Sequence, residues 1–368
     1  MMKPRFFFLL IIFVLLGTGC SIEINQDSIS SPSSQATSAN PSLPAFKVPV
    51  TWAHLNLTGK LIYLTAGQSG NSTYMRIQAL DLVTGAKSTI YKAPENGFIY
   101  SVTVSPDSKQ LIMALALPPG PDLSTHQQLY SMPLDGSASP RLLLTPPTKD
   151  DEYFQPEWSP DGKYIYFSHV NFQRAPMPKQ IYPVYEIFRM TYPDGQLEKL
   201  VDRAYWPRLS ADMSSLVYIS LDPFDGRNNL FVANADGSNA KNLTLLSPGI
   251  PDIIDAPIFS PDGQSILFSG VVPVQASQPT WLEKILGVTV VSAHVVPSDW
   301  WSLPRTGGPS IQITHIMVVG LFASISPDKQ YVASYCGGGI FVMKPDGTES
   351  TMLIGDVGGR PGTVSWIP

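Results

Sequence analysis

The residues best suited to chemistry in this chain are its histidines, its acidic side chains and an internal cysteine. Four histidines are expected in loops or at strand ends, where a ligand could reach them: His126, His169, His294 and His315. Their spacing matches no metal-ligand motif, such as two histidines one helical turn apart. Acidic residues are abundant, but no pair is marked as a general acid and a base. We therefore predict no metal ion and no cofactor.

A catalytic nucleophile is not indicated either. The sequence lacks the Gly-x-Ser-x-Gly elbow that exposes a catalytic serine, and Gly67-Gln68-Ser69-Gly70 is predicted to be a polar loop. Cys336 follows a strand-like run, so we expect a buried structural thiol there. The chain is predicted not to be an enzyme.

The amino terminus has the pattern of an export signal. Lys3 and Arg5 precede the apolar stretch 6–16, which is too short to cross a hydrocarbon layer of ~30 Å as a helix. Small residues then lead into Cys20, and this segment resembles the lipobox of bacterial lipoproteins, although Gly17 stands where leucine is usual. The resemblance implies cleavage after residue 19 and a lipid on Cys20, hence an exported protein anchored outside the cytoplasm on a bacterial membrane. A soluble secreted protein and an uncleaved anchor are the alternatives.

Residues 20–45 are predicted to be a flexible tether. They are rich in Ser, Pro, Ala, Asn and Gln, and their few large apolar side chains cannot offset the entropy of ordering by burial. Without residues 1–19 the formal charge falls from −5 to −7, because Lys3 and Arg5 are lost. A nucleic-acid partner is not expected, since its phosphates would require a basic surface.

Six apolar runs share one context, and this repetition predicts the architecture. The runs are nearly continuous, which is typical of strands covered on both faces: 61–64, 111–114, 164–167, 216–219, 266–268 and 331–333. Turn residues stand directly before them, most clearly Ser159-Pro160-Asp161-Gly162, with 57–60 as a degenerate first copy. Proline presets φ, and aspartate and glycine tolerate the conformations that a tight hairpin requires.

A second hairpin with a glycine-containing turn follows each run. These hairpins cover 75–91, 129–144, 186–201, 229–244, 300–314 and 339–354. Four strands per unit, repeated six times at roughly fifty-residue spacing, predict an all-β fold, a six-bladed β-propeller of four-stranded antiparallel blades. The first unit lacks an inner strand and 363–368 reads like one, so we expect the C-terminal strand to close the ring.

The Ser-Pro-Asp-Gly-Lys turn followed by an apolar strand, as in 159–167, resembles the repeat of the TolB-type propellers, a WD40-like family. The resemblance covers about residues 46–368, which is all of the predicted folded region. It implies a six-bladed propeller and protein partners at the cell envelope. The repeat consists of turn residues and carries no catalytic residue, and propellers of this fold have unrelated roles.

The predicted binding surface is the face that receives the long loops. These loops are 118–128, 170–185, 221–228 and 271–299. Function usually lies in loops that a rigid scaffold positions. Residues just before each inner strand should rim the central channel on this face, where they would contact a ligand or fill the channel: Tyr100, Tyr153, Gln155, Trp206, Arg208, Asp255 and His315.

The insert 271–299 contains a helical pattern over 279–287, with Trp281 and Leu282 on its apolar stripe. Either this stripe packs on the propeller, or it is an exposed patch for a protein partner or a membrane.

The sequence thus predicts a lipid-anchored, monomeric propeller that binds a protein partner or an envelope polymer without catalysis. Two alternatives remain open: a propeller enzyme, a glycan lyase or hydrolase acting at the channel mouth, and a purely structural scaffold. A group of buried ionisable residues at the mouth would favour the enzyme, and an apolar, uncharged mouth would favour partner binding.

Overall fold

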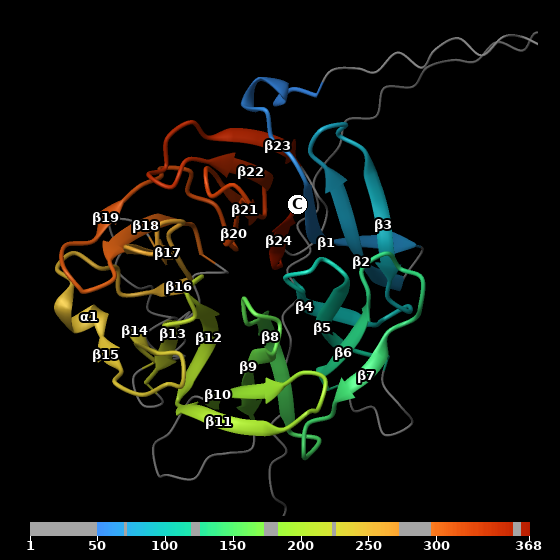
Figure 1. Ribbon diagram of the computed structural model, residues 1–368, viewed down its shortest axis with the longest axis horizontal. Helices are drawn as coiled ribbons and strands as arrows, with labels where there is room; N and C mark the ends of the chain where they lie inside the picture. The colour runs from blue at the N-terminus through green and yellow to red at the C-terminus, as the bar shows by residue number, and fades with distance from the viewer. Residues whose placement is uncertain are drawn as a thin grey trace, which may run out of the picture. The chain divides into compact units, whose positions relative to one another are not determined.

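Six four-stranded antiparallel sheets stand around a central axis in the computed structural model of the chain (Figure 1). The structure describes residues 50–69, 72–118, 126–172, 183–222, 226–271, 296–355 and 362–368, all within the unit Val48–Pro368. Each sheet is one blade, so the predicted all-β, six-bladed propeller is confirmed.

Several sequence predictions lie outside the described residues. They concern the signal peptide 1–19, the tether 20–45 and the helix 279–287, together with Cys20, Trp281, Leu282 and His294. Among the residues that the structure does describe, no helix has the length and apolar character needed to span a bilayer.

The blades follow one another along the chain, and blades 2 to 6 each begin with their innermost strand, whereas the innermost strand of blade 1 comes from the C-terminus (Figure 1). Blade 1 contains β24 (Val364–Ile367), β1 (Lys60–Ser69), β2 (Ser72–Asp81) and β3 (Lys87–Lys92). Blade 2 contains β4 (Phe98–Val104), β5 (Gln110–Ala116), β6 (Gln128–Pro133) and β7 (Arg141–Leu144). Blade 3 contains β8 (Asp151–Trp158), β9 (Tyr164–Asn171), β10 (Val184–Thr191) and β11 (Leu197–Asp202).

The remaining three blades repeat this order. Blade 4 contains β12 (Ala204–Leu209), β13 (Ser215–Leu221), β14 (Asn228–Asn234) and β15 (Lys241–Asn242). Blade 5 contains β16 (Ile254–Phe259), β17 (Ser265–Val271), β18 (Ser298–Pro304) and β19 (Ile311–Gln312). Blade 6 contains β20 (Phe322–Ile325), β21 (Val332–Cys336), β22 (Gly339–Met343) and β23 (Thr351–Gly355).

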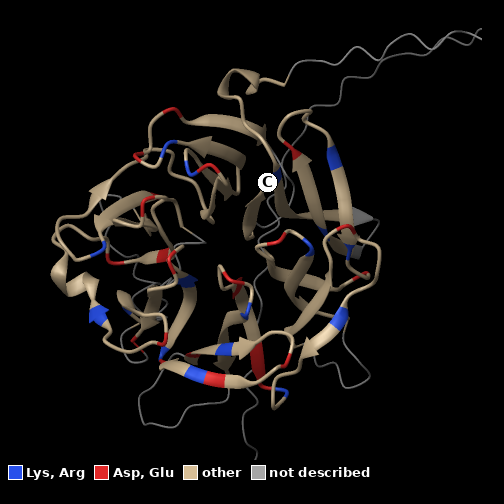
Figure 2. Ribbon diagram, in the orientation of Figure 1, with Lys and Arg blue, Asp and Glu red and all other residues tan. Residues whose placement is uncertain are grey.

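The second strand of each blade lies in the hydrophobic core between neighbouring blades. In β5 six of seven residues are buried, and in β21 all five are. Clusters join successive blades; for example, Ile112 of blade 2 packs with Tyr153 and Phe167 of blade 3. Because both faces of these strands are covered, their sequences are continuously apolar rather than alternating. Charged side chains of both signs are interspersed around the ring (Figure 2).

The Ser-Pro-Asp turns are held by one repeated hydrogen-bond pattern. The Ser159 hydroxyl donates to Asp161 Oδ1 at 2.7 Å and accepts the Tyr164 N–H at 2.9 Å, while Asp161 Oδ1 also accepts the Lys163 N–H at 3.1 Å. The same serine-to-aspartate bond recurs in four other copies, at 2.5–2.6 Å, including Ser210-Ala211-Asp212, which lacks the proline. The serine and aspartate therefore close the turn, as the sequence predicts.

These turns should make the protein sensitive to acid. Hydrogen bonds within the turns, first of all from the serine hydroxyl, lower the pKa of Asp107, Asp212 and Asp262, that of Asp212 to about 2. A carboxyl whose pKa is depressed by folding stabilises the fold above its unfolded pKa, and this contribution is lost as pH falls through the folded value. We expect the melting temperature to fall as pH drops from near 4 toward about 2. A melting temperature that stays constant across this window would contradict the expectation.

A turn glycine at a blade contact should tolerate substitution less than one in open space. Gly347 and Gly195 both adopt positive φ, 85° and 75°. A Cβ at Gly347 would lie 1.9 Å from the Ile313 carbonyl oxygen of the preceding blade, whereas nothing lies within 4 Å at Gly195. We expect Gly195→Ala to cost about 1–2 kcal/mol for the left-handed backbone alone, and Gly347→Ala clearly more. Urea unfolding of both variants measures the difference, and equal losses would contradict it.

The outer strands of blades 4 and 5 are shorter than predicted. The hairpin expected over 229–244 ends at Asn242, because the Asn242 side chain caps a helical turn, α1 (Leu243–Leu246), and accepts the Leu245 N–H at 3.3 Å. Strand β19 likewise contains only Ile311–Gln312.

The C-terminal strand closes the ring, as predicted. β24 pairs antiparallel with β1, with Ile367 opposite Lys60 and Val364 opposite Tyr63. The Thr363 hydroxyl accepts the Val102 N–H at 2.7 Å and donates to the Val102 carbonyl at 2.8 Å, which ties the last strand to blade 2. The first and last segments of the propeller therefore form one blade.

Candidate binding cavity at the channel mouth

The two faces of the propeller differ in what they carry. The turn face carries the Ser-Pro-Asp turns and the turns between third and fourth strands, and the loop face carries the connections between second and third strands and between blades. At the loop-face end of the channel lies a cavity of about 270 Å³, which we call the mouth cavity. The inner strands supply Tyr100, Gln155, Trp206 and Phe322 to its wall.

Bulges in the inner strands shape the wall of this cavity. Gln155 and Trp206 adopt the left-handed φ values of 53° and 62°, and Ala256 takes the same place in blade 5 with 48°. At each of these points the strand pairing shifts register. Each of the three residues precedes a proline, which has no N–H to contribute to the ladder and so tolerates the interruption.

Sequence analysis missed these bulges, although a signal was present. In all three strands the proline stands three residues before the turn serine, as in Pro156 and Ser159, Pro207 and Ser210, and Pro257 and Ser260. A proline at a fixed place in a strand marks a bulge. The residue directly before this proline lines the mouth cavity in two of the three blades; these residues are Gln155 and Trp206.

A chain of hydrogen bonds fixes the two bulges that line the cavity. The Gln155 N–H donates to the Ser101 hydroxyl of blade 2 at 2.9 Å. The Ser168 hydroxyl donates to Gln155 Oε1 at 2.9 Å and accepts the Trp206 N–H, also at 2.9 Å. Ser168 has no exposed surface, so these bonds are shielded from water. The wall is therefore held rigidly across blades 2, 3 and 4.

A row of aromatic rings extends from blade 3 to blade 6, and we call it the aromatic belt: Phe154, Tyr185, Tyr205, Trp206 and Phe322. All of them except Tyr205 line the cavity. Successive ring centroids are 5.9, 5.1, 6.5 and 5.4 Å apart. Desolvation by burial raises the pKa of Tyr185 to about 12, so this ring is a neutral phenol at pH 7. Tyr100 stands on the rim with 44% of its surface exposed. The cavity thus offers several aromatic surfaces to a ligand.

The polar residues of this wall include Gln127 and Glu152. Gln127 Nε2 donates to Glu152 Oε2 at 2.6 Å. Burial raises the pKa of Glu152, and the hydrogen bond from Gln127 and the charge of nearby His126 oppose that shift. Gln127 is 6% exposed, and its Oε1 has no hydrogen-bond partner among the described residues. The carboxylate and the amide oxygen are both acceptors.

The structure brings together three of the seven residues predicted to rim the channel, namely Tyr100, Gln155 and Trp206. Tyr153 lies instead in the core between blades 2 and 3, because it is on the opposite side of β8 from Glu152 and Phe154. Asp255 is 2% exposed and accepts the Ala256 N–H at 3.1 Å. His315 is exposed on the link between blades 5 and 6, with Nδ1 2.9 Å from Gln312 Nε2.

Arg208 lies at the turn-face end of the channel, where it lines a second cavity of about 390 Å³. It forms an ion pair with Glu157 of blade 3. Burial raises the pKa of Glu157, and the charge of Arg208 opposes this. The prediction placed Arg208 on the loop face with Trp206, but the bulge at Trp206 and the extended strand beyond it carry the chain across to the other end.

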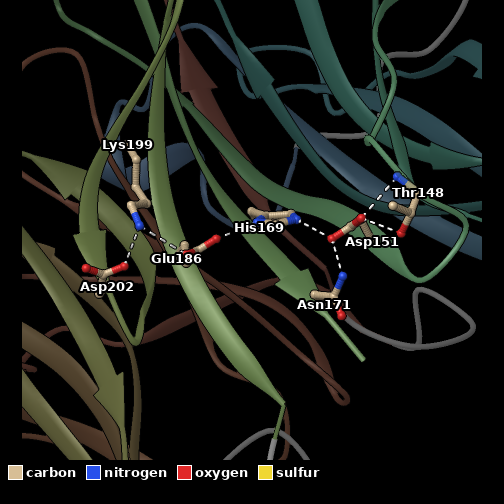
Figure 3. Close-up of polar contacts among 7 residues, drawn as sticks. All are labelled: Thr148, Asp151, His169, Asn171, Glu186, Lys199 and Asp202. Atoms are coloured by element: carbon tan, nitrogen blue, oxygen red, sulfur yellow. Dashed lines mark hydrogen bonds and ion pairs between the residues drawn. The ribbon is translucent and has the colours of Figure 1, made fainter. Parts of the chain in front are cut away.

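His169 belongs to a buried polar network in blade 3, shown in Figure 3. Its Nε2 lies 2.8 Å from Asp151 Oδ1, and its Nδ1 lies 3.0 Å from Glu186 Oε2. Each ring nitrogen of His169 thus faces a carboxyl group, and a proton between each nitrogen and its carboxyl oxygen completes both hydrogen bonds. Lys199 completes the network through Glu186 at 3.3 Å.

Asp151 is the most heavily bonded member of this network. It accepts hydrogen bonds from the Thr148 N–H at 3.0 Å, the Thr148 hydroxyl at 2.5 Å and Asn171 Nδ2 at 2.7 Å. Desolvation raises the pKa of Asp151, but these hydrogen bonds and His169 together lower it below its usual value. The three buried groups His169, Asp151 and Glu186 satisfy one another and do not line the mouth cavity.

The described residues contain no group of three histidine, cysteine or acidic side chains arranged to hold a metal ion. Cys336 is 1% exposed, as expected for a structural thiol, and burial raises its pKa.

Comparison with known proteins identifies the fold. No family model matches the chain. An uncharacterized protein of Agrobacterium fabrum is 29% identical over 156 residues, which are 40% of this chain and 48% of that protein. The match thus spans about half the length of the curated relative.

Two solved structures share the fold at low sequence identity. TolB from Acinetobacter baumannii matches with a TM-score of 0.57 and 15% identity, over 84% of this chain and 67% of that one. A protein of Agrobacterium tumefaciens proposed to be TolB matches with a TM-score of 0.54 and 17% identity, over 85% of this chain and 99% of that one. The fold is a TolB-like six-bladed β-propeller, which confirms the predicted resemblance.

Proposed function

We propose that this chain is a non-catalytic interaction module of the bacterial cell envelope, which binds a protein partner at the mouth cavity. The observation that carries the proposal is the aromatic wall, held across three blades by buried hydrogen bonds. Aromatic side chains supply large contact areas and dominate the binding energy of many interfaces. A preorganised wall also reduces the entropy lost on binding.

The ionisable groups at the cavity favour binding over glycan cleavage. Glycoside hydrolysis commonly uses two carboxyl groups that flank the bond to be broken. Among the described residues that line the mouth cavity, Glu152 is the only carboxylic acid. The buried pair Asp151 and Glu186 is bridged by His169 rather than separated by space for a sugar.

The envelope location rests on the amino-terminal sequence. The basic start, the apolar stretch 6–16 and Cys20 support export and anchoring through a lipid, with residues 20–45 as the tether. The fold likeness to TolB supports a binding role only as an analogy. Mass analysis of the protein from membranes tests the anchor: a diacylglycerol on Cys20 is expected, and an intact, unmodified Met1 end would contradict it.

Site-specific crosslinking in intact cells tests the binding role. A photoreactive amino acid at Tyr100, on the rim, should capture one defined protein reproducibly. The same group at Lys109, which is 77% exposed in its side chain on the turn face, is the control and should not capture it. Loss of the captured band in the Phe322→Ala background would place the contact in the mouth cavity.

The outcome that would overturn the proposal is an enzymatic one. If Tyr100 captures no protein and the purified chain cleaves a cell-wall polymer, the chain is an enzyme. Capture from Lys109 alone would move the partner to the turn face and would equally contradict the proposal.

A further inference from the structure

The mouth cavity combines aromatic surfaces with acceptors that no described donor fully satisfies. We propose that it holds the basic side chain of a lysine or an arginine that the protein partner inserts into the channel mouth. This inference rests on the proposed function, because it specifies which part of the partner enters the cavity.

The aromatic rings of the mouth cavity can attract a cation. Tyr100, Phe154, Phe172, Tyr185, Trp206 and Phe322 all line the cavity. The π-electrons of such rings attract a cation within about 6 Å of the ring centroid, and this attraction grows when water is excluded. Lysine and arginine also have apolar stems, which can pack on the rings while the charged end reaches deeper.

The cavity wall also contains hydrogen-bond acceptors. Gln127 is more than nine-tenths buried, and its Oε1 has no hydrogen-bond donor among the described residues. A buried acceptor left unpaired costs about 1–3 kcal/mol, and an N–H group of a ligand would recover part of that cost. Gln127 donates to Glu152 and both residues line the cavity, so an amide and a carboxylate stand side by side in its wall. An ammonium or a guanidinium carries both the charge and the N–H donors that this pair requires.

The charges at the mouth cavity favour a cationic ligand over an anionic one. None of the described residues lining the mouth cavity is lysine or arginine, and Glu152 contributes a carboxylate. Asp255 is near enough for its charge to add to the effect of burial in raising the pKa of Tyr185. Burial also raises the pKa of Glu152, and an adjacent cation would offset this by favouring the ionised form. An anionic ligand would instead meet two like charges.

The size of the cavity suits a single inserted side chain. Its volume of about 270 Å³ is just below the ~300–1,000 Å³ of typical small-molecule sites. A single long side chain suits this space better than an oligosaccharide, which would require several sugar subsites. The inference therefore names an inserted side chain rather than an envelope polymer.

Titration with amino-acid analogues tests this directly, without the partner. The probes are the N-acetyl, C-methylamide derivatives of lysine, arginine and norleucine, added to the ¹⁵N-labelled full chain at pH 7 and followed by chemical-shift changes. Norleucine has a similar stem without the charge. We expect the lysine and arginine derivatives to bind at least about tenfold more tightly than norleucine, as cation–π and charge-assisted bonds together imply.

Variants locate the binding to the cavity. Glu152→Gln should weaken binding of the lysine derivative about tenfold, because it removes the charge while keeping the shape. The control is Glu349→Gln, which removes the same charge from a side chain that is 58% exposed in an outer turn of blade 6. Binding by that variant should be unchanged. Tyr100→Ala, a substitution at the exposed rim, should also weaken binding and is not expected to affect folding.

The results separate this inference from the function on which it rests. Equal affinity for norleucine and lysine, or an unchanged affinity in both Glu152→Gln and Tyr100→Ala, would overturn the inference even if Tyr100 captures a partner. Selective binding of the cationic analogues supports the inference even if crosslinking captures nothing, in which case the proposed protein partner is the part that fails.

Discussion

Deletion of residues 363–368 is expected to remove most of the stability of the propeller. Val364, Trp366 and Ile367 are 4%, 8% and 8% exposed, and each buried side chain of this size contributes about 1.5–3 kcal/mol or more. Their sum, about 5–9 kcal/mol, is comparable to the total stability of about 5–15 kcal/mol of an ordinary domain. The deletion also removes the bonds of Thr363 to Val102 and leaves the inner edge of β1 unpaired. Thermal unfolding of the purified chain measures the effect.

A shorter truncation and a point variant provide the controls. Deletion of Pro368 alone, which is exposed and lies beyond β24, should leave the melting temperature almost unchanged. Trp366→Ala should cost about 3–5 kcal/mol, since the indole is buried and its Nε1 donates to the Thr58 carbonyl at 2.9 Å. If the deletion of 363–368 melts like the parent chain, the ring is not closed by β24.

Asp151→Ala is expected to be the most damaging substitution of a polar residue, with a loss of about 3–5 kcal/mol. It removes the acceptor to which four donors bond: the N–H and hydroxyl of Thr148, Asn171 Nδ2 and His169 Nε2. It also leaves His169 with Glu186 as its remaining carboxyl partner. Denaturant unfolding of the variant measures the loss in the free energy of unfolding.

Asp202→Ala is the matched control within the same network. Asp202 bonds to Lys199 at 2.8 Å, but its side chain is 70% exposed, so water replaces the lost partner. We expect a cost of about 0–1 kcal/mol. Similar losses in the two variants would show that burial does not decide the contribution of this network.

The six blades could be predicted from the periodic sequence because each blade repeats the same turn and strand residues. The Ser159-Pro160-Asp161-Gly162 turn forms bonds within six residues of chain, from Ser159 to Tyr164, so its structure depends little on the rest of the molecule. The place of the C-terminal strand was also predictable, since one inner strand was missing from the first unit. Asn242 shows the limit of this reasoning, because its cap replaced the end of an expected strand with α1.

The candidate site could be predicted only in part. Tyr100, Gln155 and Trp206 were found because the inner strands start at the loop face, although the three residues lie within these strands rather than before them. Tyr153 and Arg208 lie elsewhere, since side chains alternate along a strand and a bulge changes which of them face the channel. Gln127 and Glu152 were not singled out as site residues. They belong to neighbouring blades and meet only when blade 3 packs against blade 2, and no spacing in the sequence encodes that meeting.

The amino-acid sequence by itself determined the number of blades, the turns and the strand that closes the ring, because these depend on contacts between residues near in sequence or on a repeated pattern. Only the tertiary structure decided which side chains line the mouth cavity and that the Gln127 amide, whose oxygen has no donor among the described residues, lies beside the Glu152 carboxylate within an aromatic wall. The physical reason is that burial, and with it the cost of an unpaired acceptor and the pKa of Glu152, depends on blades that are brought together by folding.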